Sequence, residues 1–369
     1  MEPQTPPRRK EEGRRGPPRR PDPARRLAHQ ARRRPRVKRL LLFLAAAALA
    51  AAGALHYLVR VERFAAFTEP VFIDIPRGTS TLDIGRRLEA AGVVRHALLF
   101  AAARLPNPRA FPQAGEYRFD QPASPHQIYL RIARGDVYLV DLVIPEGSDA
   151  FDIAALVARA GFATEAEFLP LALANEGFLF PSKYRFPRRT TAAEAAKAMK
   201  RQFDLVWKEI GGAADPHAAV TLASLVEKEA VLAEERRRIA GVFANRLKIG
   251  MKLQCDPTVA YAAKLEGRWR GIIYRSDLDR QHPYNTYQTA GLPPGPIANP
   301  GRAALEAALR PLDTPELYFV AAPDGSGAHV FSKDLDGHER AVLEYRRGQQ
   351  NDQKGNGARR GGSAAAGSR

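Results

Sequence analysis

Two glutamates, Glu227 and Glu229, lie two positions apart in residues 220–233, a stretch with the periodicity of an amphipathic helix. Apolar side chains stand at i, i+3 and i+4 counted from Leu222, and the i+7 position of the same stripe is Glu229. At 100° per residue, Glu227 lies about 200° around the helix from Glu229. We therefore expect Glu227 to face solvent and Glu229 to lie on the buried face.

A buried glutamate has two possible roles. Burial of an unpaired carboxylate disfavours its charged form and raises its pKa. A raised pKa is what a general acid needs near neutral pH. Alternatively, Glu229 forms a structural ion pair with an arginine or lysine, and the pattern alone leaves both interpretations open.

Residues 251–301 are rich in proline, glycine and polar side chains, with the runs YNTY at 284–287 and GLPPGPI at 291–297. Proline fixes φ, so this density predicts a stiff loop rather than a flexible linker. Tyrosine, asparagine and glutamine on such a loop suit carbohydrate binding and ordinary loop packing equally well.

Several other chemistries have no support in the sequence. The chain has no Walker lysine motif, no G-x-G-x-x-G, no HExxH and no G-x-S-x-G. Its 8 histidines are scattered without metal-ligand spacing, and its single cysteine, Cys255, excludes an internal disulfide framework. We expect no metal and no cofactor.

An internal repeat lies before these residues in the chain. Residues 71–75 alternate like a strand, and a Pro-Arg-Gly turn leads to a helix capped by Ser80 or Thr81. Sixty-nine residues later the pattern returns, with a strand at 140–144, a Pro-Glu-Gly turn and a helix. Between the copies, a strand at 114–119 and a helix at 124–133 are expected. Such β-α units fit a binding module or a scaffold.

The net charge of +17 is concentrated at the N-terminus, where residues 1–39 carry 15 Lys and Arg against 4 Asp and Glu. This proline-rich, basic arm is predicted to be disordered. Residues 40–59 follow with no formal charge, and 20 residues span a hydrocarbon core of about 30 Å. A retained anchor is favoured over a cleaved signal peptide because the apolar run exceeds a typical signal core of about 7–15 residues.

The basic flank predicts that the arm stays in the cytoplasm and that the chain beyond Arg60 crosses the membrane. Attraction to the inner leaflet explains the arm without nucleic acid, so no nucleic-acid partner is expected.

The sequence resembles the endolytic murein transglycosylases, the YceG-like or MltG proteins. The matching blocks occur in order over roughly residues 68–348: LASLVEKEA (222–230), VFANRL (242–247), GMKLQ (250–254), DPT (256–258), YNTY (284–287), GLPPG (291–295), LYFV (317–320) and HVF (329–331).

The resemblance implies an α+β fold: a single N-terminal transmembrane helix, a small LysM-like β-α module at 68–139, then a mixed α/β catalytic domain at 140–348. A disordered tail is expected at 349–369. The catalytic glutamate of the family, the second of its VEKE motif, corresponds to Glu229. The matched blocks provide five candidate substrate-binding residues: Glu176, Gln254, Asp256, Asn285 and Tyr287.

The implied activity is lytic cleavage between N-acetylmuramic acid and N-acetylglucosamine in nascent peptidoglycan strands, which leaves a 1,6-anhydro end and helps to terminate elongation. Glu229 would act as acid and then as base, unlike the carboxylate pair of most glycosidases. Glycan strands, and peptidoglycan synthases, are the implied partners of a single-pass inner-membrane protein with an extracytoplasmic catalytic domain. Two alternatives stay open: a water-using muramidase with Asp256 as second carboxylate, and a non-catalytic glycan-binding scaffold.

One block departs from the family pattern. Residues 176–181 read EGFLFP, as in the family, but Ser182 and Lys183 replace the usual Asp-Thr pair. A function that depends on the acidic side chain at that position is therefore not expected in this chain.

Overall fold

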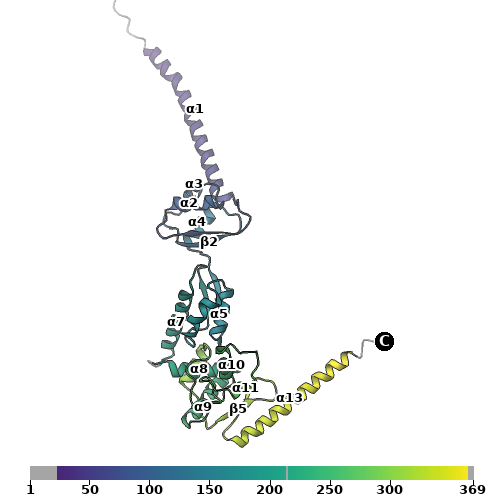
Figure 1. Cartoon of the computed structure of the whole chain (residues 1–369). Helices are drawn as coiled ribbons and strands as arrows, with labels where there is room; N and C mark the ends of the chain where they lie inside the picture. Colours follow the sequence, from purple (N-terminus) through teal and green to yellow (C-terminus); the bar gives the residue numbers. More distant parts are fainter. Residues whose placement is uncertain (1–22, 213–214, 365–369) are drawn as a thin grey trace, which may run out of the picture. The chain divides into compact units, whose positions relative to one another are not determined.

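The computed structural model describes residues 23–212 and 215–364, with side chains from residue 37 to 349. The chain divides into two compact units, residues 1–137 and residues 138–369 (Figure 1). Both combine helices with short strand pairs, so the expectation of a mixed helix and sheet fold is confirmed.

Helix α1 (Pro23–His56) is followed by a short π-helical turn, Tyr57–Val61. The second part of α1 and this turn together form an apolar segment, Val37–Val61, which is the one candidate membrane span in the described residues and is almost entirely exposed. Helix α1 begins at Pro23, inside the basic arm for which disorder is expected, and residues 1–22 lie outside the described residues.

The first unit folds as two helices against a strand pair, followed by a third helix. Strands β1 and β2 are antiparallel, with Ile73 opposite Tyr117, and the buried side chains of both form one core. Ser80 caps α2 by accepting from the backbone N–H of Asp83, as one of the two expected caps. The elements are β1 (Val71–Ile75), α2 (Thr81–Ala90), α3 (Ala97–Ala102), β2 (Gly115–Phe119) and α4 (Pro125–Arg134).

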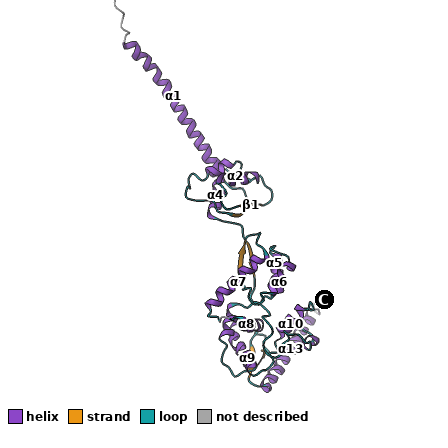
Figure 2. Cartoon of the chain, turned by 60° about the vertical axis from the view of Figure 1, so that its left-hand side comes forward, coloured by secondary structure: helices purple, strands orange, loops and turns teal. Residues whose placement is uncertain are grey.

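The second unit opens with the same order of elements, which confirms the predicted strand–turn–helix repeat. Strands β3 and β4 are antiparallel and pack with their helices around a second core. Figure 2 shows these strands as short orange arrows among the purple helices. The elements are β3 (Val140–Val143), α5 (Ala150–Arg159), α6 (Glu165–Leu173), β4 (Lys183–Phe186) and α7 (Ala192–Glu209).

The rest of the second unit surrounds helix α8 (His217–Glu229). Every residue from Val220 to Val226 is buried, and α8 contacts α9, α10 and α12. The helix predicted over 220–233 therefore begins earlier and ends at Glu229. The remaining elements are the 3-10 turn Ala233–Glu235, α9 (Arg236–Lys248), α10 (Asp256–Leu265), α11 (Arg275–Leu278), α12 (Arg302–Leu309), the antiparallel pair β5 (Tyr318–Ala321) and β6 (His329–Ser332), and α13 (Leu335–Ala364).

The predicted disordered tail, residues 349–369, is helical up to Ala364, and residues 365–369 lie outside the described residues. The tail extends a helix that is already packed, because the first part of α13 contacts β5 and β6 (Figure 1).

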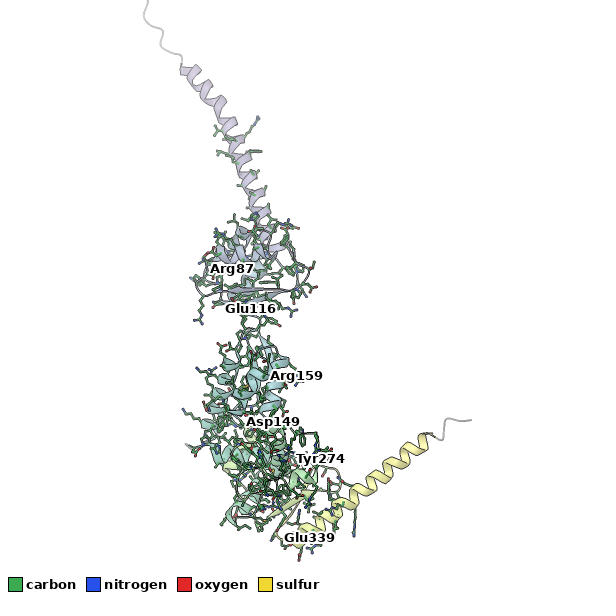
Figure 3. All side chains as sticks on the ribbon, in the orientation of Figure 1. Arg87, Glu116, Asp149, Arg159, Tyr274 and Glu339 are labelled. Carbon is green, nitrogen blue, oxygen red and sulfur yellow. The ribbon has the colours of Figure 1, made fainter. Side chains whose placement is uncertain are left out.

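A buried carboxyl group, Glu176, joins three parts of the second unit. It accepts hydrogen bonds from the backbone N–H of Ala150 at 2.8 Å, the hydroxyl of Tyr261 at 2.9 Å and the amide of Asn299 at 2.8 Å. Beside it, Asp149 caps α5 and pairs with Lys264 of α10; Figure 3 labels Asp149 in this densely packed region. These contacts fix the start of α5, helix α10 and the proline-rich loop to one another.

Burial raises the pKa of Glu176 to about 8. An ordinary glutamate in the unfolded chain has a pKa near 4.3. Between these two values the unfolded state loses its proton while the folded state keeps it, so this group makes the free energy of unfolding fall as pH rises.

We expect Glu176→Gln to flatten that dependence, because glutamine does not titrate. The wild-type free energy of unfolding should fall relative to the variant by up to about 1.4 kcal/mol per pH unit between pH 5 and 8. Denaturant unfolding at each pH measures the difference. Glu234→Gln, at an exposed position, is the control. If the free energy of unfolding depended on pH in the same way for Glu176→Gln and wild type, Glu176 would not have the raised pKa.

Candidate active site

Glu229 is the last residue of α8, and its side chain lines a cavity of about 680 Å³. The thiol of the buried Cys255 donates to Glu229 Oε1, with 3.1 Å between Sγ and Oε1. Burial raises the pKa of this thiol well above its usual range, so it keeps the proton that it donates. Glu229 is therefore a carboxyl group held by a weak donor on one side and open to a cavity on the other.

The surroundings of Glu229 favour its protonated form. Burial raises the pKa of Glu229; the Cys255 thiol opposes this, the nearby charge of Asp256 adds to it, and His329 and Arg246 oppose it more weakly. The C-terminal end of a helix carries a partial negative charge, which also disfavours a carboxylate at this position. The expectation that Glu229 lies on the buried face with a raised pKa is confirmed.

Glu227 does not face solvent as predicted; its side chain is 7% exposed. It accepts from the backbone N–H of Gly301 at 2.9 Å and lies 3.7 Å from the guanidinium of Arg236. The prediction fails because every residue from Val220 to Val226 is buried, so the periodicity marks no outer face in this part of α8. Glu227 is the glutamate with the ion pair, while the carboxyl of Glu229 lines the cavity.

The segment after α9 forms the floor of the cavity. Leu253 and Cys255 are buried in the core, whereas Gln254 and Asp256 are exposed. Gln254, Asp256 and one edge of Leu253 line the cavity. Gln254 has a φ of 49°, a left-handed conformation that a non-glycine residue rarely adopts. Such strain persists only where the surroundings impose it, and here the Gln254 N–H donates to the carbonyl of Thr286 at 3.2 Å.

Asp256 is held by Tyr287, whose hydroxyl donates to Oδ1 of Asp256 at 2.6 Å. Burial, reinforced by this hydrogen bond, raises the pKa of Tyr287, so the phenol remains a donor. The cavity therefore contains two carboxyl groups in different environments: Glu229 beside a thiol, and Asp256 beside a phenol.

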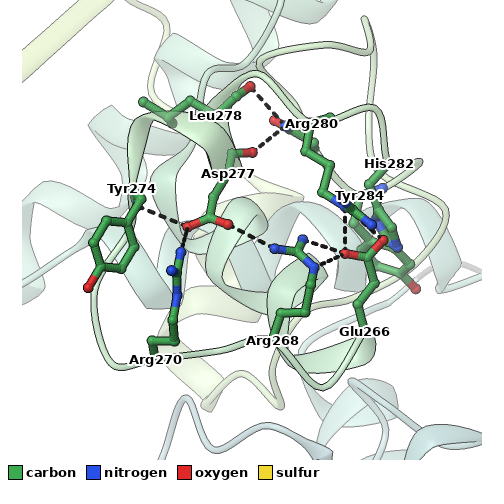
Figure 4. A network of polar contacts seen from close by, with 10 residues as sticks. Glu266, Arg268, Arg270, Tyr274, Asp277, Leu278, Arg280, His282 and Tyr284 are labelled. Carbon is green, nitrogen blue, oxygen red and sulfur yellow. Dashed lines mark hydrogen bonds and ion pairs between the residues drawn. The ribbon is translucent and has the colours of Figure 1, made fainter.

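A polar network fixes the loop that leads to Tyr287 (Figure 4). Asp277 accepts from the backbone N–H of Tyr274 at 3.0 Å and from Arg268 at 3.0 Å, which lower its pKa. Figure 4 shows Arg268 between Asp277 and Glu266. The loop is therefore held in one conformation by charged groups rather than by regular secondary structure.

Asn285 has a structural role in the same loop. It is 1% exposed, and its amide donates to the carbonyls of Asp277, Leu278 and Arg280 at 2.8–3.1 Å. Its carbonyl oxygen accepts from the N–H of Tyr287 at 3.0 Å. Asn285 thus positions Tyr287 without reaching the cavity.

Of the six predicted site residues, the structure brings four to one cavity: Glu229, Gln254, Asp256 and Tyr287. The other two, Glu176 and Asn285, do not line it and hold the backbone around it instead.

The sequence did not predict that β5, β6 and α13 also line the cavity. Their lining residues are Phe319, Val320, Ala321, His329, His338, Val342, Tyr345, Arg346 and Gln349. His329 lies in a recognised block, so its position was available in the sequence. The α13 residues had no such signal, because nothing in their sequence shows that this helix returns to the site.

The basic side chains near Glu229, Arg246 and His329, are committed to other groups. The guanidinium of Arg246 donates to the carbonyls of Leu317 at 2.6 Å and Leu253 at 2.7 Å. His329 binds Glu235 through its ring at 2.7 Å and its backbone N–H at 2.9 Å. The described residues contain no group of three or more His, Cys, Asp or Glu side chains able to hold a metal. The arrangement fits acid–base chemistry by Glu229 on a ligand bound in the cavity.

Residues 73–344 match the model of the YceG-like family. Over 309 residues, the chain is 32% identical to the endolytic murein transglycosylase of Bacillus subtilis (strain 168), covering 74% of this chain and 84% of that protein. Over 321 residues, it is 29% identical to the endolytic murein transglycosylase of Streptococcus pneumoniae (strain R6), covering 74% of this chain and 58% of that protein.

Among solved structures, the chain is similar to a yceG-like protein from Listeria monocytogenes. The identity is 31% and the TM-score 0.48, over 74% of this chain and 99% of that chain.

We expect Cys255→Ala to raise the pKa of Glu229 further, because it removes a donor that stabilises the carboxylate. Cys255→Ser keeps a donor at this position and should leave the pKa at or below the wild-type value. Titration of ¹³C-labelled glutamate carboxyl groups by NMR measures the pKa, with the Glu229 signal identified by its loss in Glu229→Gln. An unchanged pKa in Cys255→Ala would show that the thiol does not tune this acid.

Proposed function

This chain belongs to the YceG-like family, and we propose that it is an endolytic lytic transglycosylase that cuts peptidoglycan glycan strands. The observation that carries the proposal is Glu229: a carboxyl group in the cavity wall whose pKa is raised and whose neighbouring cations are committed elsewhere. The names of the relatives support peptidoglycan as the substrate.

In the proposed reaction, the Glu229 carboxyl protonates the glycosidic oxygen between N-acetylmuramic acid and N-acetylglucosamine. The bond from this oxygen to C1 of the muramic sugar breaks, and N-acetylglucosamine leaves with the proton. The Glu229 carboxylate then takes the proton of the C6 hydroxyl while O6 bonds to C1, giving a 1,6-anhydro end and regenerating the acid. The C6 hydroxyl is part of the same sugar, so its effective concentration favours ring closure over attack by water.

Asp256 has a supporting role in this mechanism. Its carboxylate lines the same cavity and is oriented by Tyr287, so it can stabilise the positive charge that develops at C1. Gln254, exposed beside it, supplies an amide for sugar hydroxyl or acetamido groups.

A second candidate, a muramidase that uses water, is favoured by this same Asp256 because hydrolysis requires a second carboxyl group to activate water or bond to the sugar. Mass spectrometry separates the two activities, since a hydrolysed end is heavier by one water than an anhydro end.

We further propose the organisation implied by the family. Residues 40–59 anchor the chain in the inner membrane, with the basic arm in the cytoplasm and the catalytic domain, residues 140–348, outside. Residues 68–139 form a LysM-like module that binds glycan. An anchored strand-cutting enzyme of this kind would end elongation of nascent strands and work beside peptidoglycan synthases.

We expect Glu229→Gln to lower the release of anhydro-ended fragments from uncrosslinked glycan by at least about 10²–10⁴-fold, the usual contribution of a general acid. Glutamine can still accept from Cys255, so the melting temperature should change little. Exposed Glu234→Gln is the matched control. Near wild-type release by Glu229→Gln would reject the assignment, and a non-catalytic scaffold would then be the better description.

We expect Asp256→Asn to release anhydro ends more slowly, because the charge that stabilises C1 is lost but the internal hydroxyl remains. The masses of the fragments from wild type and variant provide the measurement. Hydrolysed ends from the wild type, lost in Asp256→Asn, would support the muramidase instead.

A further inference from the structure

Helix α13 places one face along the cavity. The lining residues His338, Val342, Tyr345, Arg346 and Gln349 stand at i, i+4, i+7, i+8 and i+11, which is a single helical stripe. The start of this stripe is fixed, because the ring of His338 stacks on Tyr318 of β5 with 5.0 Å between the ring centres. The other end of the stripe, with Arg346 and Gln349, is exposed.

Arg346 is a cation without a partner in the part of the chain whose side chains are described. No carboxylate there lies within ion-pair distance of it. This distinguishes Arg346 from Arg246 and His329, which bind backbone carbonyls and Glu235. Next to it, Gln349 donates to the hydroxyl of Tyr345 at 2.6 Å, so the side chains around Arg346 are ordered among themselves.

Arg346 would bind an anionic group of the ligand, and the proposed substrate shows which groups are available. The N-acetylated sugar ring carries no cationic group, and its anionic groups hang from the lactyl ether of the muramic residue. They are the carboxylates of the peptide stem or, once the stem is removed, the lactyl carboxylate itself. Arg346 lies eight residues, about 12 Å of helix, from His338 and at the exposed end of the stripe. A flexible stem reaches such a rim more readily than the short lactyl group does.

We propose that Arg346 binds a carboxylate of the peptide stem and makes the enzyme prefer stem-bearing strands over stripped strands. This inference rests on the proposed function. Arginine suits the role because its planar guanidinium binds carboxylates in a bidentate way. Residue 346 lies beyond the region that matches the family model, residues 73–344, and after the last sequence block that carries the resemblance, residues 329–331.

The experiment compares Arg346→Gln with Arg347→Gln in the full-length chain in detergent micelles. Arg347 is the next residue of α13; it is exposed and does not line the cavity, so its variant removes the same charge at a neighbouring point. The substrates are uncrosslinked glycan strands with their stems and the same strands after an amidase has removed the stems.

For Arg346→Gln we expect KM on stem-bearing strands to rise roughly three- to tenfold, the range for a charge-assisted hydrogen bond at a partly exposed site, with kcat nearly unchanged. KM on stripped strands should change less than twofold. Arg347→Gln should match wild type on both substrates, and Arg346→Lys should restore part of the preference because it keeps the charge.

Equal changes of KM on both substrates, or no change of KM, would overturn the proposal. A larger rise of KM on stripped strands would also overturn it and would show that Arg346 binds the lactyl carboxylate instead. Binding of both strands to Glu229→Gln, with and without Arg346→Gln, tests the contact without turnover. The proposed function fails separately, if wild type yields no anhydro ends from either substrate.

Discussion

The site depends on keeping one carboxyl group, Glu229, in protein surroundings without a strong cationic partner. Helix α8 is buried from Val220 to Val226, and the two glutamates that follow lie at the edge of this buried stretch. Glu227 receives a backbone N–H and an arginine. Glu229 receives a thiol, which is a weak donor, and the negative end of the helix. Burial raises the pKa of both glutamates, but Glu227 is occupied by its partners, whereas Glu229 lines the cavity where a ligand can reach it.

Two carboxyl groups whose hydrogen-bond partners all come from the protein, Glu176 and Asp277, fix the backbone around Glu229. Glu176 joins α5, α10 and the proline-rich loop, and Asp277 fixes the loop that delivers Tyr287. Buried polar networks of this kind are stable when every member has its partners, and they then hold one conformation. The strained Gln254 and the ordered Tyr287 lie where two of these constraints meet, at the floor of the cavity.

Much of this was predictable from local patterns, and the failures have physical causes. The repeated strand–turn–helix order follows from alternation, turn residues and caps such as Ser80, which act over a few residues. Glu229 was found because it continues an apolar stripe. Glu227 was misplaced because periodicity assumes one exposed helix face, and the seven residues before Glu227 in α8 are buried on every side. Glu176 and Asn285 carry the sequence pattern of site residues. The partners of Glu176 lie 26 to 123 residues away, those of Asn285 lie 2 to 8 residues away, and only folding shows that these partners use up their polar groups.

The distribution of positive charge explains how such a site can bind an anionic polymer and still keep a neutral acid. A cation in contact with Glu229 would stabilise its carboxylate and lower its pKa, which would remove the proton needed for catalysis. Arg246 and His329 are near enough to oppose the raised pKa, but backbone carbonyls and Glu235 hold them in place. Water screens the charge of an exposed cation, and Arg346 is exposed on the α13 stripe. In the proposed arrangement, attraction for the polymer therefore comes from α13, while the acid comes from the end of α8.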